Sequence, residues 1–111
     1  MEKKPKYNKF YYKPLPDYLD IKKSDIEGLG LFAKDSIPED TDLGMSHLKI
    51  PILYGFVRTP LGGFFNHTED ANCYIHEELD WDDYRVFHVY TLRDIQIGEE
   101  LTLNYHIDQE P

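Results

Sequence analysis

The chain has 111 residues, of which 41% are hydrophobic and 30% are charged, and its formal net charge is −9 at pH 7. This length and composition indicate one soluble globular domain with a modest core. No apolar run is long enough to cross a bilayer, and the single cysteine, Cys73, excludes an intramolecular disulfide framework and a cysteine-rich zinc site. We therefore expect a cytoplasmic protein without a membrane partner, or one inside a host cell if its source is viral.

The first part of the chain is basic and aromatic, and the rest is acidic. Residues 1–23 hold seven lysines against three acidic residues, a balance of +4, and residues 24–111 hold five basic against 18 acidic residues, a balance of −13. Pro5, Pro14 and Pro16 disfavour a helix, so residues 1–19 are expected to form an extended arm. An acidic body repels phosphate and disfavours nucleic acid. It favours basic partners, unless the acidity only maintains solubility.

Short segments rich in β-branched and aromatic residues follow the arm, and they predict a β-rich protein. The expected strands are 20–24, 31–33, 43–50, 52–57, 72–76, 84–91 and 101–105. The expected turns are 28–30, 60–63 and 95–99, with a bend or bulge at Gly44 and an acidic hairpin loop over 77–83. Phe64 to His67 is compatible with one helical turn but is too short to decide.

Three short motifs follow one another along the chain. They are G-L-G-L-F-A at 28–33, N-H-T-E-D-A-N-C at 66–73 and R-D-I-Q-I-G-E-E-L-T-L-N-Y at 93–105. Each alone is ordinary turn or strand chemistry. Together they resemble the SET domain family of protein-lysine methyltransferases, of the small stand-alone viral or bacterial type, over about residues 20–108. The resemblance implies a single SET domain over 20–111, built of several short-stranded sheets with a C-terminal pseudoknot.

The resemblance also implies an activity and a site. Such an enzyme moves a methyl group from S-adenosyl-L-methionine to a protein or peptide lysine, and alignment of the two reactants is its main task. The Gly-x-Gly turn would contact the methionine part of the cofactor, and the Asn-His pair would bind its amino group and adenine. The last tyrosine would line the methyl-transfer pore as the catalytic residue and also touch the cofactor. The implied site residues are Gly28, Leu29, Gly30, Asn66, His67 and Tyr105.

The chain departs from the family pattern N-H-S-C-x-P-N, because it has Thr68 in place of the serine, Glu69 in place of the cysteine and Ala71 in place of the proline. The insert expected between residues 44 and 63 is very short, and Tyr54 is only a weak candidate for a second pore tyrosine. The N-terminal arm or a second subunit in a homodimer would then have to complete the substrate channel. The alternative hypothesis is a catalytically weak SET-like module that binds cofactor or protein without turnover. A third is a plain β-rich interaction domain.

The remaining candidate ligands have ordinary interpretations. His47, His76, His88 and His106 show no close metal-ligand spacing, so we expect strand or surface positions for them and no metal. Cys73 is expected in the core. The acidic loop 77–83 could attract a basic peptide, but a solvated hairpin tip is the favoured interpretation.

Overall fold

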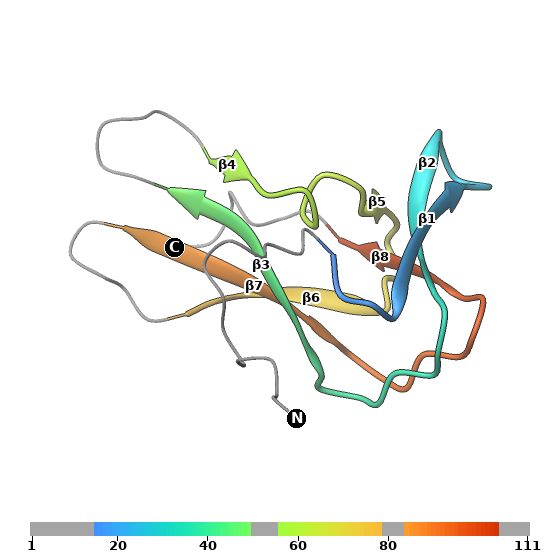
Figure 1. Cartoon of the computed structure of the whole chain (residues 1–111). Helices are drawn as coiled ribbons and strands as arrows, with labels where there is room; N and C mark the ends of the chain where they lie inside the picture. Colours follow the sequence, from blue (N-terminus) through green and yellow to red (C-terminus); the bar gives the residue numbers. More distant parts are fainter. Residues whose placement is uncertain (1–14, 50–55, 79–83, 105–111) are drawn as a thin grey trace, which may run out of the picture.

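The computed structural model describes residues 15–49, 56–78 and 84–104 (Figure 1). The described residues contain eight strands and no helix, which confirms the prediction of a mainly β fold. The strands are β1 (Leu19–Lys23), β2 (Leu29–Ala33), β3 (Asp42–Lys49), β4 (Val57–Arg58), β5 (Asn66–His67), β6 (Cys73–Glu77), β7 (Arg85–Thr91) and β8 (Glu100–Leu103). Consequently no helix long and apolar enough to cross a membrane occurs among these residues.

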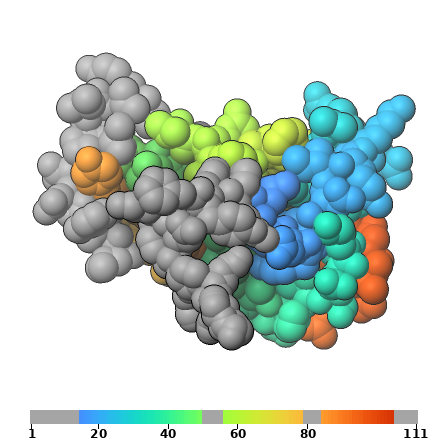
Figure 2. All heavy atoms as spheres, viewed as in Figure 1, coloured from blue at the N-terminus to red at the C-terminus, as the bar shows by residue number. Residues whose placement is uncertain are grey.

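The strands form a curled mixed sheet with the order β1-β2-β8-β6-β7-β3-β4, and β5 pairs with β8 outside this path. The pairs β1–β2 and β6–β7 are antiparallel hairpins, as their short connections require. Figure 1 shows the β1–β2 hairpin at one end of the molecule and the long strands β3 and β7 extending toward the other. In Figure 2 the hairpin (blue to cyan) and the segment before β8 (orange-red) lie at the same end.

Strand β8 is enclosed by one short stretch of chain. It pairs in parallel with β5, where Asn66 lies opposite Thr102, and also in parallel with β6, where Cys73 lies opposite Leu103. The backbone N–H of Thr68 donates to the carbonyl of Leu103 at 3.0 Å. The segment 66–73 therefore flanks β8 on both sides, and it brings the second and third sequence motifs together.

Most expected strands are present within one or two residues of their predicted limits, and the bulge at Gly44 is confirmed by a register shift in the β3–β7 pair. One expectation was wrong, and one open question is settled. Leu29 and Gly30 lie in β2 rather than in a turn, because only Gly28, with φ of +48°, has a turn conformation. The segment ending at His67 has no helical turn, because pairing with β8 extends its backbone.

Several predictions fall outside the described residues: most of the arm and of the acidic loop, most of the 52–57 strand, Tyr54, Tyr105 and His106.

The core lies between the hairpin β1–β2 and the long strands. Its fully buried side chains are Leu31, Val89, Ile95, Leu101 and Leu103. Cys73 belongs to the same cluster with 2% exposure, as expected, and burial raises the pKa of its thiol to about 12. Three of these buried side chains come from β2 and β8, so the core fixes the strands that carry the first and third motifs.

Candidate functional site

Asn66 on β5 lies where the three motifs meet. Its Nδ2 is 3.1 Å from the carbonyl oxygen of Glu27, 3.2 Å from that of Leu29 and 2.8 Å from Oε2 of Glu100. All three neighbours are acceptors, so the nitrogen of the amide must face them, and a flipped amide would set Oδ1 against three oxygens. The orientation of this side chain is therefore determined.

The other end of the amide is available to a ligand. Asn66 is half-buried, and no residue that the structure describes donates a hydrogen bond to its Oδ1. A carbonyl oxygen held in this way is an acceptor for an ammonium group or an N–H. The site thus offers a hydrogen-bond acceptor of fixed direction.

The carboxylate of Glu100 on β8 connects this amide to the turn between β1 and β2. The hydroxyl of Ser24 lies 2.9 Å from Oε1 and 3.0 Å from Oε2 of Glu100. The same hydroxyl oxygen accepts the backbone N–H of Ile26 at 2.8 Å, and Ser24 N donates to the carbonyl of Gly28 at 2.7 Å. Because the Ser24 oxygen receives a backbone N–H, its own proton is directed to the carboxylate.

The space around Gly30 explains why β2 has a glycine at this position. A Cβ at this position would lie 2.2 Å from Oε2 of Glu100 and 3.1 Å from Nδ2 of Asn66. The family resemblance implied that Gly30 contacts the cofactor, and the structure places the Glu100 carboxylate against this glycine. Glycine in a strand often marks such a close approach, and this one identifies Glu100 as a site residue that the sequence analysis missed.

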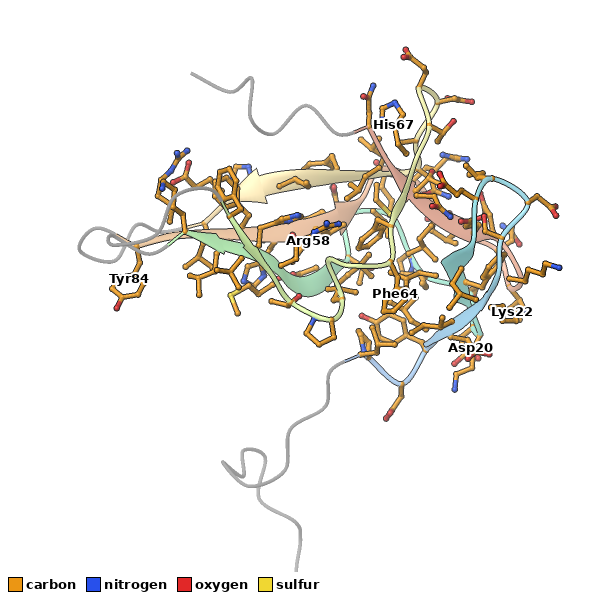
Figure 3. All side chains as sticks on the ribbon, turned by 90° about the horizontal axis from the view of Figure 1, so that it is seen from above. Asp20, Lys22, Arg58, Phe64, His67 and Tyr84 are labelled. Atoms are coloured by element: carbon orange, nitrogen blue, oxygen red, sulfur yellow. The ribbon has the colours of Figure 1, made fainter. Side chains whose placement is uncertain are left out.

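The remaining predicted residues lie around this cluster. Gly28 and Leu29 are exposed, and His67 is exposed beside β8. Figure 3 shows His67 at the outer edge of the structure, away from Asp20 and Lys22 on β1. The structure therefore brings Gly28, Leu29, Gly30, Asn66 and His67 to one end of the sheet, whereas Tyr105 lies outside the described residues.

Asn104 follows β8 directly and precedes Tyr105. Its Oδ1 is buried and, among the described residues, has no hydrogen-bond partner. An unsatisfied buried acceptor costs about 1–3 kcal/mol, so such groups require a reason. One such reason would be a bound molecule that donates a hydrogen bond to this oxygen.

Asn72 has a structural role beside β8. Its Nδ2 donates to the carbonyl of Glu100 at 2.8 Å, and its Oδ1 accepts the N–H of Thr102 at 2.9 Å. The side chain is 3% exposed. It substitutes for a backbone partner along β8, and this holds the loop 68–72 against that strand.

The other titratable groups in residues 15–49, 56–78 and 84–104 have structural surroundings. No group of three or more His, Cys, Asp or Glu side chains in the described part of the chain is placed to hold an ion. His47 lies in β3 as expected but is buried, with its Nδ1 2.8 Å from the Ser46 hydroxyl. Burial, together with the positive charge of Arg58, lowers the pKa of His47, so a neutral ring is favoured there.

Comparison with known proteins agrees with this geometry. The SET domain family model matches residues 53–106. The chain is 40% identical over 52 residues to an H3 lysine-36 specific histone-lysine N-methyltransferase of Aspergillus oryzae, and 42% identical over 48 residues to one of Gibberella zeae. These stretches are 47% and 43% of this chain but only 5% of each relative.

Solved structures show the same fold. A Plasmodium falciparum protein assigned as a histone methyltransferase superposes with a TM-score of 0.65 at 22% identity, covering 82% of this chain and 95% of that one. A humanized mutant of the Chaetomium thermophilum Polycomb Repressive Complex 2 superposes with a TM-score of 0.61 at 24% identity, covering 84% of this chain and 15% of that one. The fold and the ordered motifs define a SET domain. The chain is a SET domain protein, related to histone-lysine methyltransferases, and the predictions of family and fold are confirmed.

The family uses S-adenosyl-L-methionine, and the residues of this site suit it. The cofactor carries a cationic sulfonium and an ammonium group. The site offers the Asn66 Oδ1, which no described residue occupies, and the negative charge of Glu100. The Asn104 Oδ1, without a partner among the described residues, is a further acceptor at the end of β8. Oxygen acceptors and a carboxylate stabilise cationic groups, so these groups fit the cofactor.

Proposed function

We propose that this protein transfers a methyl group from S-adenosyl-L-methionine to a lysine side chain of a protein. The observation that carries the proposal is the Asn66 amide, whose nitrogen is held by three acceptors and whose oxygen accepts no hydrogen bond from a described residue. It lies between the Gly28–Gly30 segment and β8, so three motifs that are far apart in sequence meet at one point. The bound cofactor supplies an electrophilic methyl group on its sulfur.

The protein's own residues bind and orient the reactants. Oδ1 of Asn66 would accept a hydrogen bond from the cofactor's ammonium group, and the exposed backbone at Gly28 and Leu29 would contact its methionine part. Gly30 would act indirectly, because Glu100 covers it. The backbone of His67 would lie against the adenine.

Tyr105 would carry the chemical step. It comes two residues after β8, so the strand that pairs with Asn66 also leads to this side chain. If its hydroxyl positions the amine mainly in the transition state, Tyr105→Phe lowers kcat at least tenfold and changes cofactor affinity much less. An unchanged single-turnover rate and an unchanged number of added methyl groups, measured on folded Tyr105→Phe protein, would assign the step to another residue.

The substrate would be a basic protein segment with an exposed lysine. The chain carries a net charge of −9, which attracts such partners, and the curated relatives are named as histone methyltransferases. Because the chain spans about a twentieth of the length of those relatives, basic peptides of several sequences should be tested.

The channel would be completed by the N-terminal arm, residues 1–19, or by a second subunit. The described end of the arm supports the first choice, because Leu15 and Pro16 line a shallow pocket with Ile21 and Pro60 of the domain. Removal of residues 1–14 should therefore reduce activity or stability. A fully active truncated protein that light scattering shows to be monomeric would exclude both arrangements.

The deciding experiment combines calorimetry with methyl transfer. S-adenosyl-L-methionine is titrated into the protein, and labelled-methyl transfer to basic peptides is read by mass spectrometry. Asn66→Ala should weaken binding by about 1–3 kcal/mol, since the ligand loses its acceptor. Asp70→Asn, an exposed change in the neighbouring loop, is the matched control and should bind normally. Binding without transfer would favour a module that does not turn over, and absence of binding would refute the proposal.

A further inference from the structure

We propose that Glu100 is a positioning residue that sets the direction and the acceptor strength of the Asn66 amide, and thereby the affinity for the amino-acid part of the cofactor. This inference rests on the proposed function. Glu100 comes 34 residues after Asn66 and 76 residues after Ser24. The contacts that carry the inference are therefore tertiary rather than local.

The Glu100 contact is the strongest of the three that hold the amide. It is the shortest, at 2.8 Å against 3.1 and 3.2 Å for the two backbone carbonyls, and its acceptor is charged. Hydrogen bonds to ionised acceptors are roughly twice as strong as neutral ones. Since an amide has only two hydrogens on its nitrogen, the carboxylate takes one of them and the two carbonyls share the other.

The carboxylate is itself held in place. The Ser24 hydroxyl contacts both of its oxygens, at 2.9 and 3.0 Å, and Gly30 leaves room for it against β2. Glu100 starts β8, whose next three residues are buried. A side chain fixed at its base by a buried strand and at its tip by a hydroxyl cannot easily turn away from Asn66.

A charged acceptor on the nitrogen also changes the oxygen of the same amide. Hydrogen bonds in a chain polarise one another, and a negative charge at Nδ2 shifts electron density toward Oδ1. Oδ1 then becomes a better acceptor for a cationic donor. The chain Ser24–Glu100–Asn66 thus ends on the atom that would accept a hydrogen bond from the cofactor.

The inference is tested by a double-mutant cycle with S-adenosylhomocysteine, which keeps the amino-acid part and does not react. Glu100→Ala should weaken binding about tenfold, which corresponds to about 1.4 kcal/mol. In an Asn66→Ala background the same change should weaken binding less than twofold, because the route through Asn66 is already lost. Additive effects in the double variant would overturn the proposal. Glu99→Gln is the matched control, because Glu99 contacts Arg93 and Asn72 rather than Asn66.

A second ligand separates positioning from general structural damage. Methylthioadenosine lacks the α-amino and carboxyl groups of the amino-acid part, so Glu100→Ala should leave its affinity unchanged. Equal losses of affinity for both ligands would show that the variant damages the whole site and would overturn the proposal.

If Glu100→Ala does not fold, Glu100→Gln keeps the shape of the side chain and removes its charge. Glu100→Gln should lower the affinity for S-adenosylhomocysteine about threefold and leave that for methylthioadenosine unchanged. Unchanged affinity for both ligands would refute the positioning role of Glu100.

A ligand-free measurement distinguishes this inference from the proposed function. In NMR spectra of the free protein, the side-chain amide protons of Asn66 should exchange slowly with water, and Glu100→Ala should accelerate that exchange. Unmodified protein that shows this coupling but binds no cofactor would refute the proposed function, and the cofactor role of Glu100 with it. Cofactor binding with no such coupling would refute only the positioning role.

Discussion

Gly62 and Gly63 stand next to each other before the Asn-His motif, and replacement of each by alanine should have opposite results. A Cβ on Gly62 would lie 2.1 Å from the carbonyl oxygen and 2.8 Å from the carbonyl carbon of Ser46. A Cβ on Gly63 would meet only carbonyl oxygens at 3.6 and 3.7 Å, which are ordinary contacts. Because the atoms facing Gly62 belong to the backbone of β3, no side-chain rotation can relieve the overlap.

The cost can be worked from the contacts that would separate. Relief of the overlap requires the turn 60–63 to move away from β3. That movement breaks the hydrogen bond from Thr59 N to Ser46 O, 3.0 Å long, and loosens Leu61, which is 3% exposed. Overpacking costs typically 1–3 kcal/mol and a lost hydrogen bond about 1 kcal/mol. We expect Gly62→Ala to lower the free energy of unfolding by about 3 kcal/mol.

Urea and thermal unfolding of the two variants test this expectation. For a chain of this length, about 1 kcal/mol corresponds to about 4 °C in Tm, so Gly62→Ala should melt about 12 °C lower. Gly63→Ala should be neutral, or stabilising by less than about 1 kcal/mol, because alanine reduces the entropy of the unfolded chain. If the two variants unfolded within about 0.5 kcal/mol of each other, the close approach of this turn to β3 would be refuted.

Three further outcomes follow from the site and the core. Gly30→Ala should destabilise the protein by about 1–3 kcal/mol in urea unfolding, because the new methyl group displaces the Glu100 carboxylate from its partners; a neutral result would place that carboxylate elsewhere. Asn72→Ala should cost about 2–3 kcal/mol in the same assay, because it leaves the buried N–H of Thr102 without an acceptor. The pKa of the Cys73 thiol is about 12 in the folded protein against 9.0 as its ordinary value, so the unfolded chain loses this proton first and stability falls as pH rises from 9 toward 12. A Cys73→Ala variant should show a smaller fall over that range, and native protein should resist thiol reagents at pH 8.

Local sequence patterns predicted the strands well, because each depends on side chains a few residues apart. The run from Tyr84 to Thr91 is β-branched and aromatic, and β7 occupies nearly all of it. The turn at Gly98 was expected from the Gly-Glu pair, and its φ of +88° confirms the need for glycine. The family resemblance then supplied the overall fold, which alternation alone would not have given.

The sequence could not predict which segments meet across long distances. The parallel pairing of β5 with β8 joins residues 36 positions apart, and a two-residue strand has no periodicity to detect. Glu100 lies inside the third motif, but it is one of 21 acidic residues, and no local pattern indicated that its carboxylate meets Gly30 and Asn66. The available signal was Gly30 inside an apolar strand, which indicated a close approach but not the group that makes it.

The central position of β8 has a consequence for synthesis on the ribosome. β8 lies between β2 and β6 in the sheet, yet it is the last strand of the described chain to be made. Until residue 103 leaves the exit tunnel, the hairpin β1–β2 and the strands β6, β7 and β3 have no shared neighbour to pair with. Long-range strand pairing of this kind is slow and leaves edges exposed to other chains. The nascent domain should therefore remain protease-sensitive until its last strand emerges, and then become resistant in a single step.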